Sequence, residues 1–327
     1  MQFAPTSATR TTVPGTSPGG EPVDRVPLPG LDPLVAQQAR FRVVGEGALA
    51  ARALVPATPR AQELFATDRA GTEQALRGVL QVVEAAAGGA AAGRGVRLDG
   101  ISLSDTPLGM GAATVRAHVE GDPVLRSTFA GLAPGTRDAE LRAWAAKTAQ
   151  SNSSALATAI GGWINLGPVA SGPLLHSRGV EARGFDATGD GDSLGRAVRI
   201  IRHEAQHVVD SQPRLGLDAA RNLREVVAEL HSTGLADLQV ARRALALDGV
   251  VSDASLLRAA QHRPYADLEE RTARLLSSLG YGVASARPLV DMHSAELAEV
   301  LVQRIAGRTG DDTRQARESL AGFYGAG

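Results

Sequence analysis

The segment RIIRHEAQHVVDSQ, residues 199–212, holds a glutamate and two histidines with the spacing HExxH. On a helix, His203 and His207 lie one turn apart on the same side, so both imidazoles can reach one metal ion. Glu204 is offset from His203 by about 100°, and its carboxylate can approach a water beside the ion without being a ligand. Zinc-assisted hydrolysis needs this arrangement, because nitrogen donors hold the ion and a carboxylate takes a proton from the water. The alternative is a partly exposed helix with two unrelated histidines.

A third ligand is needed to complete such a site. In the extended form of the motif a glycine and a third histidine follow, but Asp210 and Pro213 occupy their positions, which excludes that class. The segment SQPRLG then predicts a short turn into an antiparallel helix, NLREVVAELHS, with Glu225 and Glu229 at positions i and i+4. Glu225 is placed to complete a His/His/Glu site, and Glu229 to hydrogen-bond the outer nitrogen of a ligand histidine. The alternative for EVVAE is a solvated acidic face.

The combination HEAQHVVD…EVVAE resembles the gluzincin metallopeptidases, in which HExxH on one helix is completed by a glutamate on the next. The ExxAE form is similar to the peptidase domain of anthrax-lethal-factor-like toxins, and the pattern as a whole to thermolysin-like domains. The resemblance covers residues 190–240 and implies a bound Zn²⁺ ion, with ligands, general base and supporting acid at His203, His207, Glu225, Glu204 and Glu229. RHEAQHVV also resembles an HExxH domain of unknown function among proteins associated with bacterial contractile injection systems.

Peptide hydrolysis also needs a group that stabilises the oxyanion formed when water attacks the carbonyl. The resemblance to gluzincins implies a tyrosine or a histidine in this role. The candidates are His231, Tyr265 and Tyr281, and we assign the role to His231 and Tyr281. The alternatives are a solvated helix histidine at position 231 and a packing residue at position 281.

The same resemblance implies that an extended peptide binds along an edge strand upstream of HExxH, by adding a strand to the sheet. The segment ATAIGGWINLGP is the candidate, because its two glycines permit close backbone approach. We expect Gly162, Trp163 and Ile164 to contact the substrate there. The alternative is a buried core strand in which Trp163 packs inward.

The elements that position these residues are predicted to be mostly helices. Asp192 or Ser193 caps the helix that carries HExxH. Apolar spacing predicts helices from Asp32 to Gly89 and at 137–150, 193–210, 217–238, 253–262, 264–280, 293–306 and 312–323. Alternating apolar and polar residues predict strands within 96–104 and 113–121, and the run 157–167 is β-like. The expected fold is α+β and predominantly α, a zincin-like helical domain with a small central sheet.

Composition limits the classes of partner. A net charge of −1 and 3% aromatic residues argue against nucleic acid and acidic membranes as partners. The chain has no cysteine, so a metal site must use histidines and carboxylates. No stretch approaches 18 continuous apolar residues, so we expect no membrane span and a soluble chain made in the cytoplasm.

The chain divides by composition into a leader and two regions. Residues 1–30 are rich in Pro, Gly, Ser and Thr, lack the apolar segment of a secretory signal, and predict disorder. This leader is either a bland extension or a recognition tag for a non-classical export or injection machinery. We expect a mainly helical region at 31–150 and the metallopeptidase region at 151–327.

The sequence therefore predicts a zinc metalloendopeptidase that hydrolyses peptide bonds in a protein or peptide substrate. Arginine is used almost throughout in place of lysine, which is typical of GC-rich bacterial genes and fits a secreted toxin or effector. A non-catalytic, zinc-stabilised helical module is the alternative, as a component or cargo of a bacterial injection or secretion system. A third possibility is an interaction protein without a metal.

Overall fold

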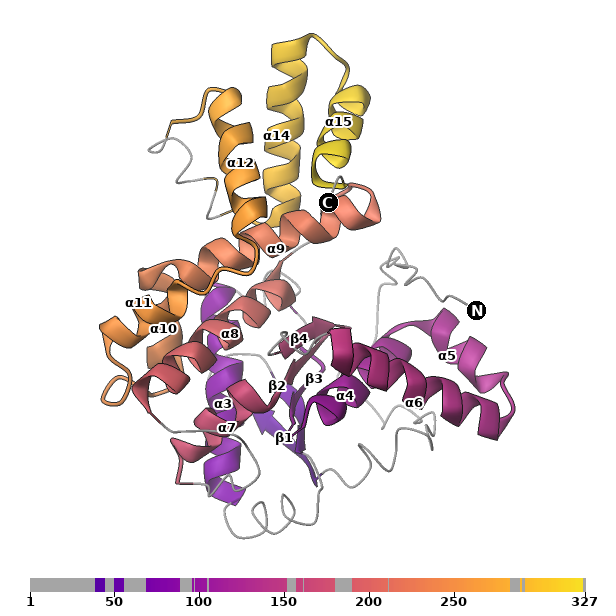
Figure 1. Ribbon diagram of the computed structural model, residues 1–327, viewed down its shortest axis with the longest axis vertical. Helices are drawn as coiled ribbons and strands as arrows, with labels where there is room; N and C mark the ends of the chain where they lie inside the picture. The colour runs from indigo at the N-terminus through magenta and orange to yellow at the C-terminus, as the bar shows by residue number, and fades with distance from the viewer. Residues whose placement is uncertain are drawn as a thin grey trace.

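A five-stranded sheet lies among helices that make up most of the molecule (Figure 1). This agrees with the expected α+β class, predominantly α. The expected leader lies outside the described residues. The computed structural model describes residues 39–44, 50–55, 69–88, 96, 98–104, 106–151, 157–160, 162–179, 190–210, 212–282, 289 and 292–325.

The strands lie in the order β1-β2-β3-β5-β4 across the sheet. β1 (Ala39–Val44) pairs antiparallel with β2 (Ala50–Val55), and β3 (Gly100–Leu103) is parallel to both of its neighbours. β4 (Ala157–Ile160) and β5 (Trp163–Leu166) form an antiparallel hairpin, which leaves β4 at the edge. Gly162 in its turn has a φ of +81°, a conformation that favours glycine.

The strand expected within 96–104 and the β-like run 157–167 are confirmed as β3 and the β4–β5 hairpin. The helix expected over 39–44 and 50–55 is wrong, because these residues form β1 and β2. The segment ARFRVV alternates arginines with apolar residues, and this period of two belongs to a strand. Asp32 and Pro33, where the expected helix begins, lie outside the described residues.

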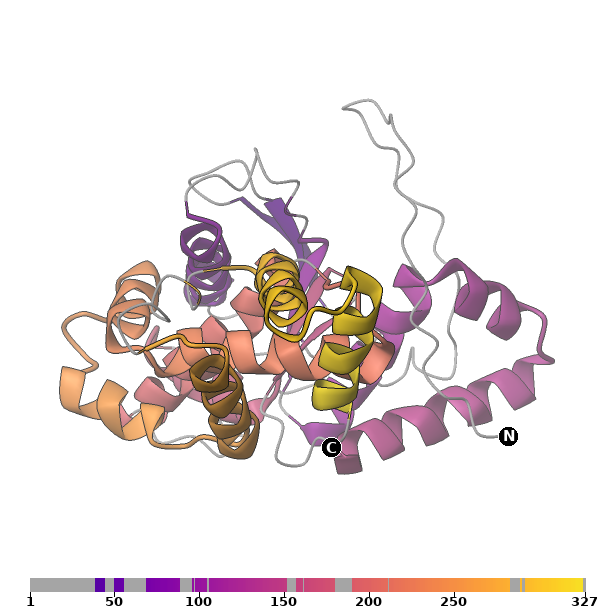
Figure 2. The same cartoon turned by 90° about the horizontal axis from the view of Figure 1, so that it is seen from above.

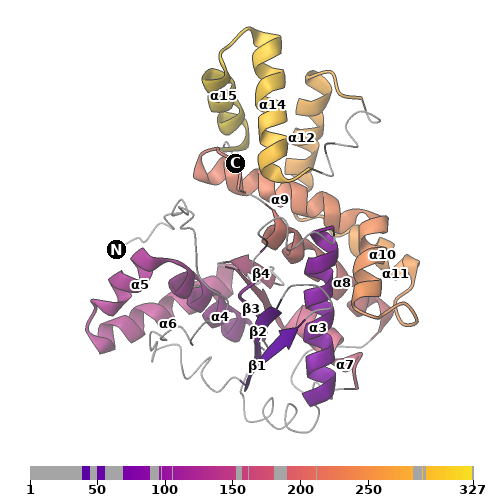
Figure 3. The same cartoon turned by 180° about the vertical axis from the view of Figure 1, so that it is seen from behind.

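Helices cover both faces of the sheet (Figure 3). α3 (Arg69–Ala86), α7 (Pro168–His176) and α8 (Gly191–Val209) share one hydrophobic core with alternate residues of β3 and β5, including Ile101 and Ile164. On the opposite face, Trp163 of β5 packs against Ala117 of α4 (Pro107–Gly121). α8 therefore lies directly on the sheet, with Glu204 close enough to β4 to accept a hydrogen bond from the backbone of Ala159.

The strand expected at 113–121 is wrong, because these residues belong to α4. Thr106 caps this helix through the N–H of Gly109. Val115 and Val119 face the core shared with α5 (Pro123–Ala130) and α6 (Pro134–Ser151), whereas Ala117 faces the sheet. Because both faces of the helix are buried, apolar residues stand at every second position, 115, 117 and 119. This is the alternation expected of a strand, and it explains the wrong prediction.

The C-terminal half contains α9 (Leu217–Thr233), α10 (Leu235–Ala244), α11 (Asp253–Ala260), α12 (Ala266–Ser278), α14 (Ser294–Thr309) and α15 (Thr313–Gly325). The helix expected at 217–238 is divided at Gly234, whose backbone is extended. α12, α14 and α15 pack on α9 around a second hydrophobic core. In the view from above, the yellow C-terminal helices lie over α9 (Figure 2).

Residues on both sides of the boundary expected at position 150 contribute to the first core. Leu76 and Val79 of α3 belong to it, as do Val198 and Ile201 of α8. Within the described ranges, no helix combines the length and the apolar character that crossing a membrane requires.

Candidate metal centre

α8 carries the HExxH residues and is buried along most of its length. Asp190 caps it by accepting hydrogen bonds from the N–H groups of Asp192 and Ser193. The cap therefore lies before the two residues expected in that role. Leu194, Ile201 and other apolar residues face the first core. On another side of α8, Arg199 and His203 face α9, and Arg202 reaches Asp237 of α10.

α8 and α9 pack antiparallel, as expected. Arg199 pairs with Glu229, His203 with Glu225, and His207 with Glu225 and Arg224. Later positions on α8 therefore contact earlier positions on α9. Arg224 donates a hydrogen bond from Nη2 to the carbonyl oxygen of His207 at 2.7 Å, which fixes the register where α8 ends.

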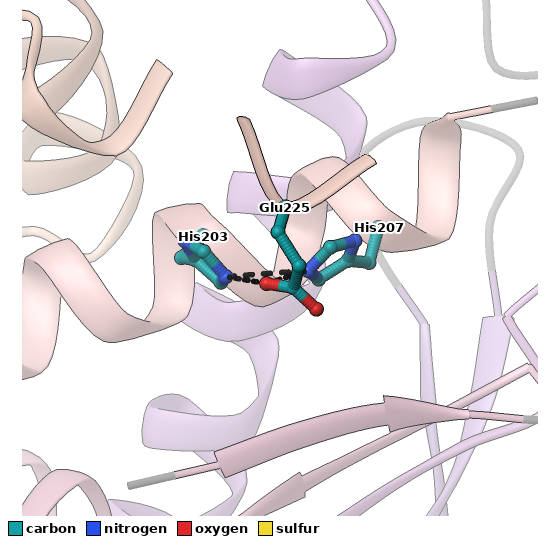
Figure 4. Close-up of side chains that lie close together, drawn as sticks. All are labelled: His203, His207 and Glu225. Carbon is teal, nitrogen blue, oxygen red and sulfur yellow. Dashed lines mark hydrogen bonds and ion pairs between the residues drawn. The ribbon is translucent and has the colours of Figure 1, made fainter. Parts of the chain in front are cut away.

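Three donor atoms from these helices form a nearly equilateral triangle (Figure 4). The Nε2 atoms of His203 and His207 lie 3.2 Å apart. Oε2 of Glu225 lies 3.3 Å from Nε2 of His203 and 3.4 Å from Nε2 of His207. Among the described residues, these three side chains form a group of potential ligands that lie close enough together to hold a metal ion.

The size of this triangle fits a tetrahedral ion with short bonds. Zinc binds nitrogen and oxygen at about 2.0–2.1 Å, and tetrahedral angles then separate neighbouring donors by about 3.3–3.4 Å. Two imidazole nitrogens and a carboxylate oxygen repel one another at these distances unless a proton or a cation lies among them. The donor set of two imidazoles and one carboxylate also suits zinc.

The charges of the three groups depend on one another. Burial lowers the pKa of His203, but Glu225, Glu229 and Glu204 outweigh it and raise this pKa to about 9. Burial likewise raises the pKa of Glu225, yet the hydrogen bonds and charges of the two histidines hold it well below its ordinary value. In the metal-free protein a proton therefore compensates the carboxylate, and a cation bound there replaces that proton.

Glu204 lies beside the triangle and outside it. It is 8% exposed. Burial raises its pKa, an effect that the positive charges of His203 and His207 oppose. The backbone N–H of Ala159 on β4 also donates to its carboxylate. In an antiparallel hairpin, residue pairs that are hydrogen-bonded to each other alternate with pairs that are not. Ile160 and Trp163 form the pair next to the turn, so the next pair, Ala159 and Ile164, is not hydrogen-bonded. The N–H of Ala159 therefore points away from β5, toward α8.

Glu229 lies on the other side of His203. Its side chain is fully buried and its Oε1 accepts a hydrogen bond from Nη2 of Arg199 at 2.5 Å. Its Oε2 lies 3.5 Å from Nδ1 of His203, where the hydroxyl of Ser232 also lies at 3.4 Å. This is the position expected of an acid that orients the outer nitrogen of a ligand histidine.

Tyr265 is brought to the site by the connection between α11 and α12. Its ring stacks on the imidazole of His203, with centroids 6.0 Å apart and an angle of 10° between planes. Burial raises the pKa of Tyr265, and so do the charge of Glu225, a hydrogen bond to it and the charge of Glu204. The hydroxyl therefore stays protonated and remains a hydrogen-bond donor.

The structure does not bring His231 and Tyr281 to the three donors. Nδ1 of His231 lies 3.4 Å from Oδ1 of Asp237, which also pairs with Arg202 of α8. Tyr281 packs against the second core, with the guanidinium of Arg304 5.4 Å from the centre of its ring. Sequence reasoning considered Tyr265 and did not select it.

The expected substrate residues Gly162, Trp163 and Ile164 do not lie on a free edge. β5 pairs with β3 on one side and β4 on the other, and Trp163 is only 4% exposed. The structure therefore agrees with the alternative of a buried core strand, and the expected substrate role requires correction. The edge strand near α8 is β4.

Sequence reasoning also missed Arg199 and Ala159. Arg199 precedes His203 by one turn, and Glu229 follows Glu225 by one turn, so the mirrored spacing on two antiparallel helices was a usable signal for the pair. No comparable signal identified Ala159, because strand order decides its place. Comparison of the chain with protein-family models, with curated proteins and with solved structures finds no match in any of the three.

Proposed function

We propose that this protein is a zinc-dependent metallopeptidase of the gluzincin type, acting on peptide bonds of a protein or peptide substrate. The observation that carries the proposal is the triangle of His203, His207 and Glu225 donors, with Glu204 beside it. These three residues would hold the ion. When bound, zinc polarises the scissile carbonyl and lowers the pKa of an attacking water toward neutrality.

Glu204 supplies the general base of this proposal. Its carboxylate takes a proton from the attacking water and passes it to the leaving amine. A base with a pKa raised toward neutrality is suited to both steps, and burial moves the pKa of Glu204 in that direction. When substrate binds, the carboxylate of Glu204 gives up its hydrogen bond from the N–H of Ala159 and accepts one from the attacking water.

Tyr265 is the group that we assign to the oxyanion, in place of His231 and Tyr281. Its protonated hydroxyl, held near Glu225, can donate a hydrogen bond to the negative charge that develops on the carbonyl oxygen. Stacking on His203 limits the motion of its ring. An oxyanion donor must be positioned before the reaction to be effective, and this contact meets that condition.

The edge of β4 that faces away from β5 is the surface that we assign to the substrate backbone. Ala159 directs its N–H toward α8, and an extended peptide beside β4 would add a strand to the sheet next to Glu204.

The test is metal content together with peptide cleavage. The zinc content of the purified protein is measured by elemental analysis, and cleavage of a mixture of unstructured peptides by mass spectrometry, before and after chelation. We expect one zinc per chain and cleavage that chelation abolishes and added zinc restores. Glu204→Gln should lower kcat/KM by at least about 100-fold while zinc stays bound. Glu120→Gln, a carboxylate change on α4, is the matched control and should cleave normally.

A non-catalytic, zinc-stabilised module is the second candidate. The burial of His203 and Glu204 favours it, because a closed site suits a structural ion. In that case the wild type would bind zinc and lose thermal stability on chelation, but it would cleave no peptide. Chelation-sensitive cleavage that Glu204→Gln abolishes excludes this candidate.

A further inference from the structure

Glu229 has a fully buried side chain, whereas the side chain of Glu225, one turn earlier on α9, is 18% exposed. One of its oxygens accepts from Arg199 at 2.5 Å, and the other lies 3.5 Å from Nδ1 of His203. The hydroxyl groups of Ser232 and Thr233 donate to the main-chain carbonyl of Glu229 and leave the carboxylate to these two partners.

A carboxylate buried to this degree needs a cation. Arg199 is itself buried, and its guanidinium remains charged in proteins. It lies one turn before His203 on α8, so Arg199 and His203 reach Glu229 from the same helix. Glu229 is thereby held between a permanent cation and the outer nitrogen of a proposed ligand.

The position of Glu229 also decides which carboxylate meets the metal. Glu225 and Glu229 lie one turn apart on α9, and both approach His203. Glu225 lies on the Nε2 side, where the other donors are, whereas Glu229 lies on the Nδ1 side with Arg199. A hydrogen bond from the N–H at Nδ1 to Glu229 would fix the imidazole in the tautomer that leaves Nε2 free to bind a metal.

We infer that Arg199 is a positioning residue for the metal centre. It holds Glu229 against Nδ1 of His203, which orients the imidazole and keeps Glu229 away from the metal, so that Glu225 is the carboxylate ligand. Arg199 acts through Glu229 and touches neither the ion nor the substrate. This inference rests on the proposed zinc site, but not on hydrolysis.

The test is a double-mutant cycle read out as zinc affinity. The zinc dissociation constants of the wild type, Arg199→Met, Glu229→Gln and the double variant are measured by competition with a chromogenic chelator. Arg199→Met should weaken zinc binding by about 10–100-fold. The double variant should bind zinc as Glu229→Gln does, because Arg199 has no further effect once Glu229 has lost its charge.

Arg202→Met is the matched control. Arg202 is equally buried on α8, but it pairs with Gln206 and with Asp237 of α10 and contacts none of the three donors. Its substitution should lower thermal stability without changing zinc affinity. An equal loss of affinity in Arg199→Met and Arg202→Met would show a general effect of helix stability and would overturn the inference.

The remaining outcomes are also decisive. Unchanged zinc affinity in Arg199→Met, or a double variant weaker than Glu229→Gln, would overturn the inference. If Arg199→Met does not fold, the comparison of the double variant with Glu229→Gln still decides, because in both variants position 229 carries no charge for Arg199 to hold and the double variant leaves no buried charge unpaired. A wild type that binds zinc but cleaves no peptide refutes the hydrolase alone, and one that binds no zinc refutes both.

Discussion

Helix α9 has two buried faces of opposite chemistry. Toward α8 it presents Glu225, Glu229 and Ser232, which surround His203. Toward α12, α14 and α15 it presents an apolar stripe that includes Leu223 and Val226. Both faces are largely buried, yet one carries charged groups and the other hydrocarbon side chains.

The difference shows what each face contributes. A fully buried leucine or valine stabilises the fold by about 1.5–3 kcal/mol, so the apolar face can account for the packing of the C-terminal helices. Buried charges cost free energy unless each is paired, and an apolar replacement is often as stable. The polar face is therefore poorly explained by stability alone, and the proposed metal site would account for it. The predictions below separate the two faces, from the largest expected effect to the smallest.

Removing a ligand on the polar face should have the largest effect. Binding of structural zinc contributes about 10–16 kcal/mol in small zinc-binding peptides. His207→Ala removes one of the three donors, and we expect stoichiometric zinc to be lost. Elemental analysis after gel filtration measures this, with Leu301→Ala on the apolar side as the control. One zinc per chain in His207→Ala would show that the triangle is not the binding site.

Cutting a side chain on the apolar face should affect stability and leave the metal in place. Leu301 of α14 is fully buried in the second core. Leu301→Ala should lower the free energy of unfolding by about 2–5 kcal/mol, as measured by urea denaturation with a fixed excess of zinc. Zinc stoichiometry should stay at the wild-type value. Loss of zinc from the folded variant would contradict the separation of the two faces.

Acidity should act on the polar face alone. The pKa of His203 is raised to about 9 in the metal-free protein, so below this pH its proton must leave before zinc binds. Zinc affinity should therefore rise by about tenfold per pH unit up to pH 9, with about one proton released. Calorimetric titrations in buffers of different ionisation enthalpy count that proton. Binding without proton release at pH 7 would contradict the assignment, and Leu301→Ala should release the same number as the wild type.

A single hydrogen bond of the second core should have the smallest effect. The buried hydroxyl of Tyr324 lies 3.0 Å from that of Thr272, which also donates to the carbonyl oxygen of Leu268 at 2.8 Å. Tyr324→Phe should reduce stability by about 0.5–1.5 kcal/mol, with unchanged zinc affinity. The measurement is the shift in the urea midpoint at constant slope. A loss above that of Leu301→Ala would mean that polar contacts hold this core as well.

Local spacing allowed much of the metal centre to be predicted. His203 and His207 follow from one helical turn, and Glu225 and Glu229 from a second turn placed opposite by the short connection SQPRLG. These spacings are set by residues close together in the sequence, so they depend little on tertiary packing. The mostly helical class followed from the same kind of evidence.

The parts that were not predicted depend on tertiary structure. Tyr265 reaches His203 only because α10 and α11 turn the chain back over α8. Ala159 reaches Glu204 because β4, rather than β5, lies at the edge of the sheet. Strand order is not encoded by periodicity, and the enclosure of α4 between the sheet and α6 even gave a helix the pattern of a strand.

The antiparallel pairing of α8 and α9 places all three proposed ligands in one local hairpin. His203 and Glu225 are 22 positions apart, whereas Asp210 and Ser294, which join the end of α8 to the start of α14, are 84 positions apart. Contacts of short sequence separation form faster than distant ones. We therefore expect zinc to be captured before the C-terminal helices dock, and stopped-flow refolding should be faster with zinc present from the start. An equal rate without zinc would refute this. If refolding is faster with zinc, the ion acts first in folding and, under the proposed function, only later in hydrolysis.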